Sequence, residues 1–238
     1  MAKLFESDDF FFLFSAILFL VVNFEPKVST LYALMCVGGW VAYVDIRSNR
    51  IFEMPPLKKS TTSWTEGILY GVIAFVAFMF LTPIILNVTG IDSAATTQSV
   101  LNSISTGFST KPVLEASKTT SFVVWGQLIP YVETIFFSTL IPLWIATKYG
   151  YSLSKLKDQL ILMSITGIAA MLFHITAKGI TLADQPALVT TFIFFFLNSY
   201  LVIHFREKIQ AAAMHIAGNS IAINNILKIF KFSFFGGV

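Results

Sequence analysis

Long uncharged runs of mostly apolar residues, separated by short polar segments, extend along almost the whole chain. Seven runs can be marked, at residues 10–24, 28–44, 67–91, 119–147 (interrupted only by Glu133), 159–177, 185–205 and 209–227. A helix that crosses a bilayer needs about 20 apolar residues, within a range of about 17–25. Six runs reach that length and the first is marginal. The pattern predicts an all-α, polytopic membrane helix bundle of six to seven transmembrane helices, eight at most, in one domain over residues 1–238.

Composition agrees with this prediction. The chain is 55% hydrophobic and only 12% charged, whereas soluble domains carry about 25% charged residues. We therefore expect membrane lipids as partners, and the net charge of +3 gives no reason to expect nucleic acid. The 25 phenylalanines include runs at 10–12 and 194–196, which are expected to face lipid.

Basic residues predict an orientation. If the spans alternate, ten of the sixteen Lys and Arg residues share one side with the N-terminus. Cytoplasmic loops are enriched in these residues, so this side is predicted to be the cytoplasmic one. These ten are Lys3, Arg47, Arg50, Lys58, Lys59, Lys148, Lys155, Lys157, Arg206 and Lys208. The remaining six lie on the other side. The distribution favours an integral protein of the plasma (inner) membrane with a cytoplasmic N-terminus.

A connecting segment, residues 88–118, is rich in Ser and Thr. Within it Val100, Leu101, Ile104 and Phe108 recur at helical spacing, which predicts a short interfacial helix. A surface connector is the favoured interpretation, with a lid over a site as the alternative.

A few polar side chains interrupt the apolar runs. An ionised carboxylate at the bilayer centre costs at least about 2.5–3.5 kcal/mol, so Glu133 is expected to have a partner and a function. His174 and His215 also lie within apolar runs, and Asn219 follows His215 by four residues, on the same helix face. His204, two residues before Arg206 at a span end, is expected to lie among lipid headgroups.

These residues suit one kind of chemistry if they converge from their different spans. A carboxylate beside an imidazole can orient a water molecule and accept its proton, and a second imidazole with an amide can donate hydrogen bonds to a developing oxyanion. Counting along each run places Glu133, His174 and His215 at depths that differ by about 10 Å, at 1.5 Å per helical residue. Convergence therefore requires tilted, broken or displaced helices.

The segment PYVETIFFST, residues 130–139, resembles the first motif of the CAAX-protease and bacteriocin-processing family of intramembrane endopeptidases. That motif is Pro, two residues, Glu-Glu, two residues and Phe-Arg-Gly, so Pro130, Glu133 and Phe137 match. His174 is placed as the histidine of the family's second motif, Phe-x-x-x-His. His215 with Asn219 matches the third, His-x-x-x-Asn. The resemblance covers residues 119–230.

Four accessory positions depart from the family pattern. Thr134 stands where the motif has its second Glu, Ser138 replaces the Arg, Thr139 the Gly, and Ala170 the Phe of the second motif. The resemblance implies that Glu133 and His174 activate water and that His215 and Asn219 stabilise the oxyanion. We favour a mechanism without a cofactor, because His215 with Asn219 makes a better donor pair than half of a zinc site. Zinc held by Glu133 and the two histidines is the alternative.

Three functions follow from the sequence. The leading one is an intramembrane endopeptidase that cleaves a peptide or protein substrate near the membrane surface. The second is a catalytically inactive membrane scaffold or immunity-type binding protein on the same fold. The third is a proton-coupled carrier in which Glu133 and the histidines relay protons, for which we find no inverted repeat in the sequence.

The orientation can be tested directly. A tag within residues 47–59 should be accessible only from the cytoplasmic side of sealed vesicles, because that loop holds four of the ten basic residues. Labelling of the tag by an impermeant reagent from outside intact cells would contradict the predicted topology.

Overall fold

The computed structural model describes residues 63–106, 122–178 and 180–227, and every regular element among them is helical. The elements are α3 (Trp64–Val88), α4 (Thr97–Thr106), η1 (Val124–Leu128), α7 (Ile129–Glu133), η2 (Thr134–Leu140), α8 (Ile141–Tyr149), α9 (Leu156–Lys178), α10 (Gln185–Phe205) and α11 (Ile209–Leu227). The segments η1 and η2 are π-helical. The predicted helical class is confirmed for these residues, whereas the predicted spans at 10–24 and 28–44 lie outside the described part of the chain.

Four helical segments are long and apolar enough to cross a membrane: Trp64–Val88, Val124–Tyr149, Leu156–Ile175 and Gln185–Phe205. They coincide with four of the predicted runs, which supports a membrane protein. The last predicted run forms α11, but this helix carries more polar residues and does not meet the same standard of apolar composition. The total of six to seven spans stays a prediction.

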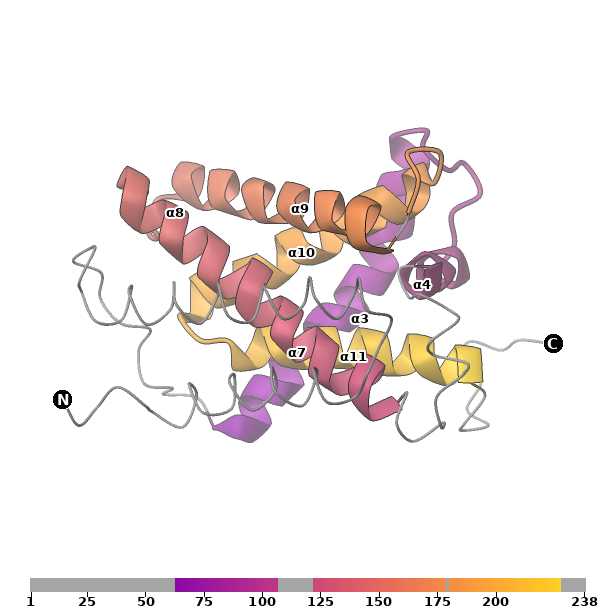
Figure 1. Cartoon of the computed structure of the whole chain (residues 1–238), viewed down its shortest axis with the longest axis horizontal. Coiled ribbons are helices and arrows are strands. Elements are labelled where there is room, and N and C mark those ends of the chain that lie inside the picture. The colour runs from indigo at the N-terminus through magenta and orange to yellow at the C-terminus, as the bar shows by residue number, and fades with distance from the viewer. Residues whose placement is uncertain (1–62, 107–121, 179, 228–238) are drawn as a thin grey trace.

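The helices pack as crossed pairs (Figure 1). Helices α9 and α10 form a hairpin and lie side by side, and α3 packs against α11. The long segment from η1 to α8 crosses both pairs, contacting α11 through η1 and α7 and contacting α10 through η2. Residues of α7, α9 and α11 are thereby brought towards the middle of the bundle.

Local sequence signals set the helix ends. Ser63 and Glu66 form a capping box at the start of α3, in which each side chain bonds the backbone N–H of the other residue. Helix α8 ends at Gly150, whose positive φ of 72° suits a residue without a side chain.

The segment from η1 to α8 is continuous but is not a uniform α-helix. Each π-helical stretch ends two residues before a proline, Pro130 after η1 and Pro142 after η2. The N–H of Ile129 bonds the carbonyl of Val124, and that of Ile141 bonds Phe136, five residues back in each case. Because proline clashes with the carbonyl four residues before it, a wider turn lets the helix continue. Glu133 lies between the two wide turns.

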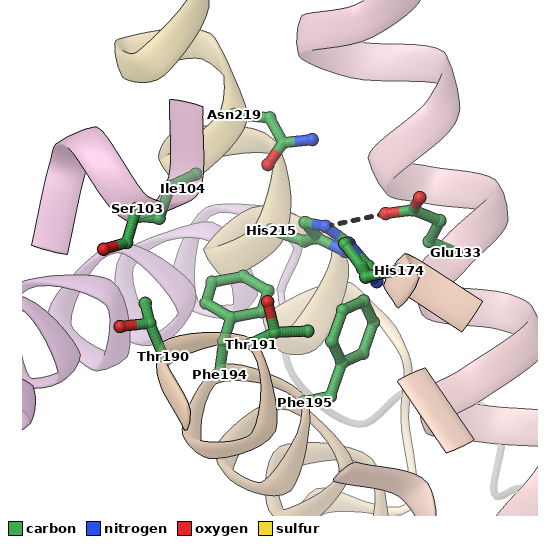
Figure 2. Close-up of a pocket in the computed structure, with 10 residues that line it drawn as sticks. All are labelled: Ser103, Ile104, Glu133, His174, Thr190, Thr191, Phe194, Phe195, His215 and Asn219. Atoms are coloured by element: carbon green, nitrogen blue, oxygen red, sulfur yellow. Dashed lines mark ion pairs between the residues drawn. The ribbon is translucent and has the colours of Figure 1, made fainter. Parts of the chain in front are cut away.

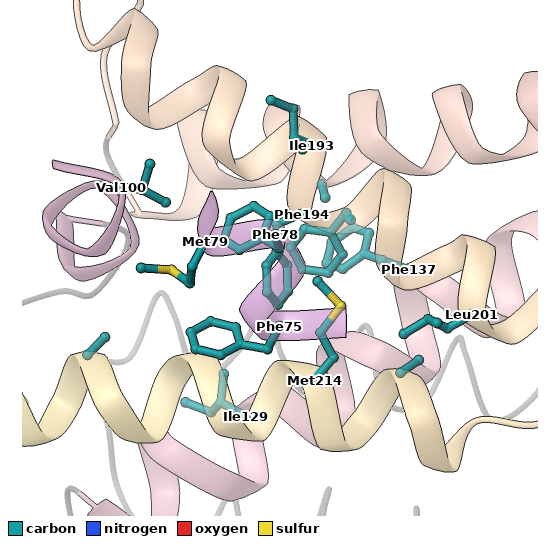
Figure 3. Close-up of a cluster of buried hydrophobic side chains, with 14 of the residues drawn as sticks. Phe75, Phe78, Met79, Val100, Ile129, Phe137, Ile193, Phe194, Leu201 and Met214 are labelled. Carbon is teal, nitrogen blue, oxygen red and sulfur yellow. The ribbon is translucent and has the colours of Figure 1, made fainter. Parts of the chain in front are cut away.

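The core is aromatic and lies beside the site residues (Figure 3). Phe78 of α3 meets Phe194 of α10 edge to face with ring centroids 5.2 Å apart, and Phe195 meets Phe137 of η2 at the same separation. Phe194 and Phe195 are buried. The expectation that residues 194–196 face lipid is therefore wrong for these two rings, which fill the space between α10, α3 and η2 instead.

Helix α3 approaches α11 closely at Gly71, where an added Cβ would lie 2.4 Å from the carbonyl oxygen of Gln210. Backbone cannot yield as a side chain can, so Gly71→Ala should lower the free energy of unfolding by about 1–3 kcal/mol, as overpacking does. The measurement is thermal or denaturant unfolding in detergent.

The matched control is Gly126→Ala, because the nearest atom to its Cβ would be the Ser220 hydroxyl at 3.3 Å, and a side chain can shift by the few tenths of an ångström that this contact requires. Equal stability of the Gly71→Ala variant and the wild type would contradict the close contact between α3 and α11.

Candidate active site

The four predicted site residues line one small cavity (Figure 2). Its volume is about 40 Å³, which is enough for a water molecule. The wall residues are Ser103, Ile104, Glu133, His174, Thr190, Thr191, Phe194, Phe195, His215 and Asn219. Polar side chains from α4, α7, α9, α10 and α11 therefore surround a space large enough for the smallest reactant of a hydrolysis.

The four predicted residues reach this cavity from three helical segments. Glu133 is the last residue of α7, His174 lies in α9, and His215 and Asn219 lie in α11. The predicted difference in depth does not keep them apart, because the helices cross one another and all four residues line one cavity (Figure 1). Their catalytic roles remain predictions.

Glu133 and His215 form the central contact of the cavity. The Oε2 atom of Glu133 lies 3.3 Å from Nε2 of His215, and the two residues are only 1% and 3% exposed. The other ring nitrogen, Nδ1, lies 3.0 Å from the hydroxyl of Thr134. Two consecutive residues thus contact both nitrogens of one imidazole, although neighbouring side chains of a regular α-helix do not face the same side. This arrangement occurs at the change from α7 to the wider turn of η2.

The ring of His174 is held by a hydrogen bond at Nδ1. Its Nδ1 atom lies 2.7 Å from the carbonyl oxygen of Ala170, one turn earlier in α9. Because a carbonyl oxygen only accepts, Nδ1 must carry the proton, and the Nε2 atom of the neutral ring is then the nitrogen that can accept one. The ring lies near Phe173 and Phe195, with centroids 5.7 and 5.9 Å away.

Asn219 completes one side of the cavity, one turn after His215. Its amide nitrogen donates to the carbonyl oxygen of Trp125 over 3.4 Å, a long hydrogen bond. The His215 ring is enclosed by Phe194 and Phe195, with centroids 4.8 and 5.1 Å away. The aromatic rings exclude water from the side of the imidazole that faces α10.

The arrangement of the site side chains gives no support to the alternative of a zinc ion held by Glu133, His174 and His215. Among the described residues, no group of three His, Cys, Asp or Glu side chains is arranged to hold a metal ion. Glu133 and His215 are in direct contact with each other instead.

Two parts of the site differ from the favoured predictions. Thr134, in sequence only a departure from a motif, contacts His215. Helix α4 is not the favoured surface connector, because its Val100 and Leu101 are buried, and its Ser103 and Ile104 form cavity wall, the position of the alternative, a lid over a site. The apolar spacing in α4 was the signal for burial. Phe108, assigned to the same predicted helix, lies outside the described residues.

Comparison of the chain with protein-family models, with curated proteins and with solved structures finds no match. The resemblance to intramembrane endopeptidases therefore rests on the motif residues themselves.

The Glu133–His215 contact should appear as an energetic coupling. In a double-mutant cycle of Glu133→Ala and His215→Ala, the coupling in unfolding free energy should be about 0.5–3 kcal/mol, because removal of either partner alone leaves the other polar group buried. The measurement is reversible unfolding in detergent.

The control cycle pairs Glu133→Ala with His204→Ala, since the exposed His204 contacts Tyr200 and Phe205 on its own helix and does not line the cavity. Additive effects in the Glu133–His215 cycle would show that the contact does not form in solution.

Proposed function

We propose that this chain is an integral-membrane endopeptidase that hydrolyses a peptide bond near the membrane surface, using water activated by Glu133 and His174. The observation that carries the proposal is the gathering of Glu133, His174, His215 and Asn219 around one buried, water-sized cavity. The N-terminus would lie in the cytoplasm, and the plasma (inner) membrane would hold the enzyme.

Two groups in the cavity are suited to accept protons. Glu133 is an acceptor at both oxygens when ionised, and the Nδ1 bond of His174 to Ala170 makes Nε2 the accepting atom of that ring. A water molecule held by both would have its oxygen lone pair directed at a substrate carbonyl carbon. General-base assistance of this kind contributes about 10²–10⁴-fold in rate.

Two other groups are suited to donate. Nε2 of His215 faces the carboxylate of Glu133, which accepts only, so this nitrogen carries a proton. The amide nitrogen of Asn219 donates as well. Their present bonds, 3.3 and 3.4 Å, are long, and hydrogen bonds in an active site without substrate are often long until the transition state forms. Both donors could therefore turn to an oxyanion.

The proposed reaction balances without a further reactant. The water oxygen bonds to the carbonyl carbon as a water proton passes to the Glu133 carboxylate, and the carbonyl oxygen becomes an oxyanion that His215 and Asn219 stabilise. The carbon–nitrogen bond then breaks as the nitrogen takes the proton from Glu133. The products are a carboxylic acid and an amine, which become a carboxylate and an ammonium ion by transfer of one proton, and Glu133 is again ionised.

Substrate entry requires movement of the wall. A cavity of about 40 Å³ holds water but not an amino-acid residue. Helix α4 contributes Ser103 and Ile104 to the wall, so its displacement would widen the cavity.

A proton-coupled carrier is the second candidate, favoured by the direct contact of two titratable side chains, Glu133 and His215, inside the bundle. Such a protein would move protons across the membrane without cleaving peptides.

Glu133→Gln should abolish cleavage of membrane-anchored peptides while leaving the fold intact. The substitution is nearly isosteric and removes the proton acceptor, so a loss of about 10²–10⁴-fold is expected. Asn219→Ala should slow cleavage by about 10²–10³-fold, the usual effect of losing one oxyanion donor. The assay uses a fluorescence-quenched peptide library in proteoliposomes containing equal amounts of each variant.

His204→Ala is the control and should cleave at the wild-type rate, because His204 is exposed and does not line the cavity. Equal cleavage by the wild type and Glu133→Gln would remove the protease proposal. Proton flux into the proteoliposomes that depends on Glu133, with no peptide cleaved, would establish the carrier instead.

A further inference from the structure

We infer that Thr134 is a positioning residue, whose hydroxyl donates to Nδ1 of His215 and so fixes the orientation of the ring whose Nε2–H lies at the cavity. Its catalytic consequence rests on the proposed function, but its effect on His215 can be measured without any substrate.

The contact has the features of a positioning bond. The oxygen of the Thr134 hydroxyl lies 3.0 Å from Nδ1, closer than the 3.3 Å between Glu133 and Nε2. Thr134 is fully buried and His215 is 3% exposed, so bulk water does not compete for either group. A buried bond of this length holds the ring in one orientation.

The chemistry of the two partners assigns the proton. An ionised Glu133 only accepts, so the nitrogen beside it, Nε2, carries hydrogen. The neutral ring then has a lone pair at Nδ1, and the Thr134 hydroxyl can donate to it. A carboxylate at position 134 could not donate. It would favour a second proton at Nδ1 and hold His215 as an imidazolium ion.

The backbone makes this double contact possible. Glu133 closes α7 and Thr134 opens η2, so the two side chains leave the helix at the change to a wider turn and reach opposite edges of one ring. His174 is held in the opposite sense, through Nδ1–H to Ala170. The Nε2 atom therefore has a different role in the two rings: it is a donor in His215 and an acceptor in His174.

The groups on the cavity side of His215 are mostly neutral. Among the residues lining the cavity, only Glu133 of α7 and His174 of α9 also titrate. The wall residues from α4 and α10 are hydroxyl-bearing or apolar, and α3 contributes none to the wall. The ring thus has a carboxylate at Nε2 and a neutral hydroxyl, that of Thr134, at Nδ1.

The test is nitrogen NMR of the protein labelled with ¹⁵N-histidine in detergent micelles. The chain has three histidines, and His215→Gln assigns the His215 signals by their loss. In the wild type, Nε2 should be protonated and Nδ1 should be a hydrogen-bonded acceptor. Thr134→Val, which keeps the shape and removes the hydroxyl, should leave Nε2 protonated, because Glu133 still accepts from it, and should move the Nδ1 signal to that of an acceptor without a hydrogen bond. Thr134→Ser should restore the wild-type signals.

Activity provides the second readout. Thr134→Val should lower kcat by about 10–100-fold with KM little changed, the size of effect seen when the partner that orients a functional imidazole is removed. Thr134→Ser should stay close to the wild type. The matched control is Thr166→Val, which also removes a buried hydroxyl bond, to the carbonyl of Leu162 at 3.0 Å, but does not line the cavity. Thr166→Val should lose about as much thermal stability as Thr134→Val and should keep the wild-type kcat.

The outcomes separate this inference from the proposed function. Identical His215 signals in the wild type and Thr134→Val would overturn the inference, whatever the activity. If the wild type cleaves no peptide, the proposed function falls and the NMR result still decides the role of Thr134. Should Thr134→Val fail to fold, Thr134→Ala makes the same prediction with a smaller side chain.

Discussion

A carboxylate inside an apolar helix bundle is tolerated only if other groups replace the water it has lost, and this requirement organises the middle of the molecule. Glu133 meets it through His215, which fixes α7 against α11. The close approach of α3 to α11 at Gly71 and the aromatic rings of α10 around His215 then hold α11 from its other sides. The polar pair and the apolar core are thus parts of one packing arrangement.

The hydrogen bonds around the cavity fall into two groups by length. The bonds that hold the histidines through Nδ1 are short, 2.7 Å for His174 and 3.0 Å for His215. The bonds that engage the proposed donors, from His215 to Glu133 and from Asn219 to Trp125, are 3.3 and 3.4 Å. The Nδ1 bonds fix the orientation of each ring, whereas the longer contacts leave the donor atoms of His215 and Asn219 able to turn to a ligand while the helices stay packed. This difference is what a preorganised site needs, because the rings stay in place while their cavity-facing atoms change partners.

Sequence was sufficient for the elements and for the choice of polar residues, but not for their contacts. Apolar runs located α3, α9 and α10 because length and hydropathy decide a membrane helix almost alone. The wide turns before Pro130 and Pro142 could not be read from periodicity, and they determine how Glu133 and Thr134 are presented. The burial of Phe194 and Phe195 also depends on which helices face α10, since phenylalanine suits lipid and protein interior equally well.

The departures from the protease motif become coherent once burial is considered. Thr134 and Ser138 stand where the motif has a Glu and an Arg, and both are fully buried in η2. A lone charge at either of these buried positions would cost several kcal/mol, and the two hydroxyl side chains carry none. The hydroxyl at position 134 can also donate to His215 as a carboxylate could not. Thr134 therefore weakens the match to the motif and at the same time gives His215 a partner suited to the role of hydrogen-bond donor at Nε2.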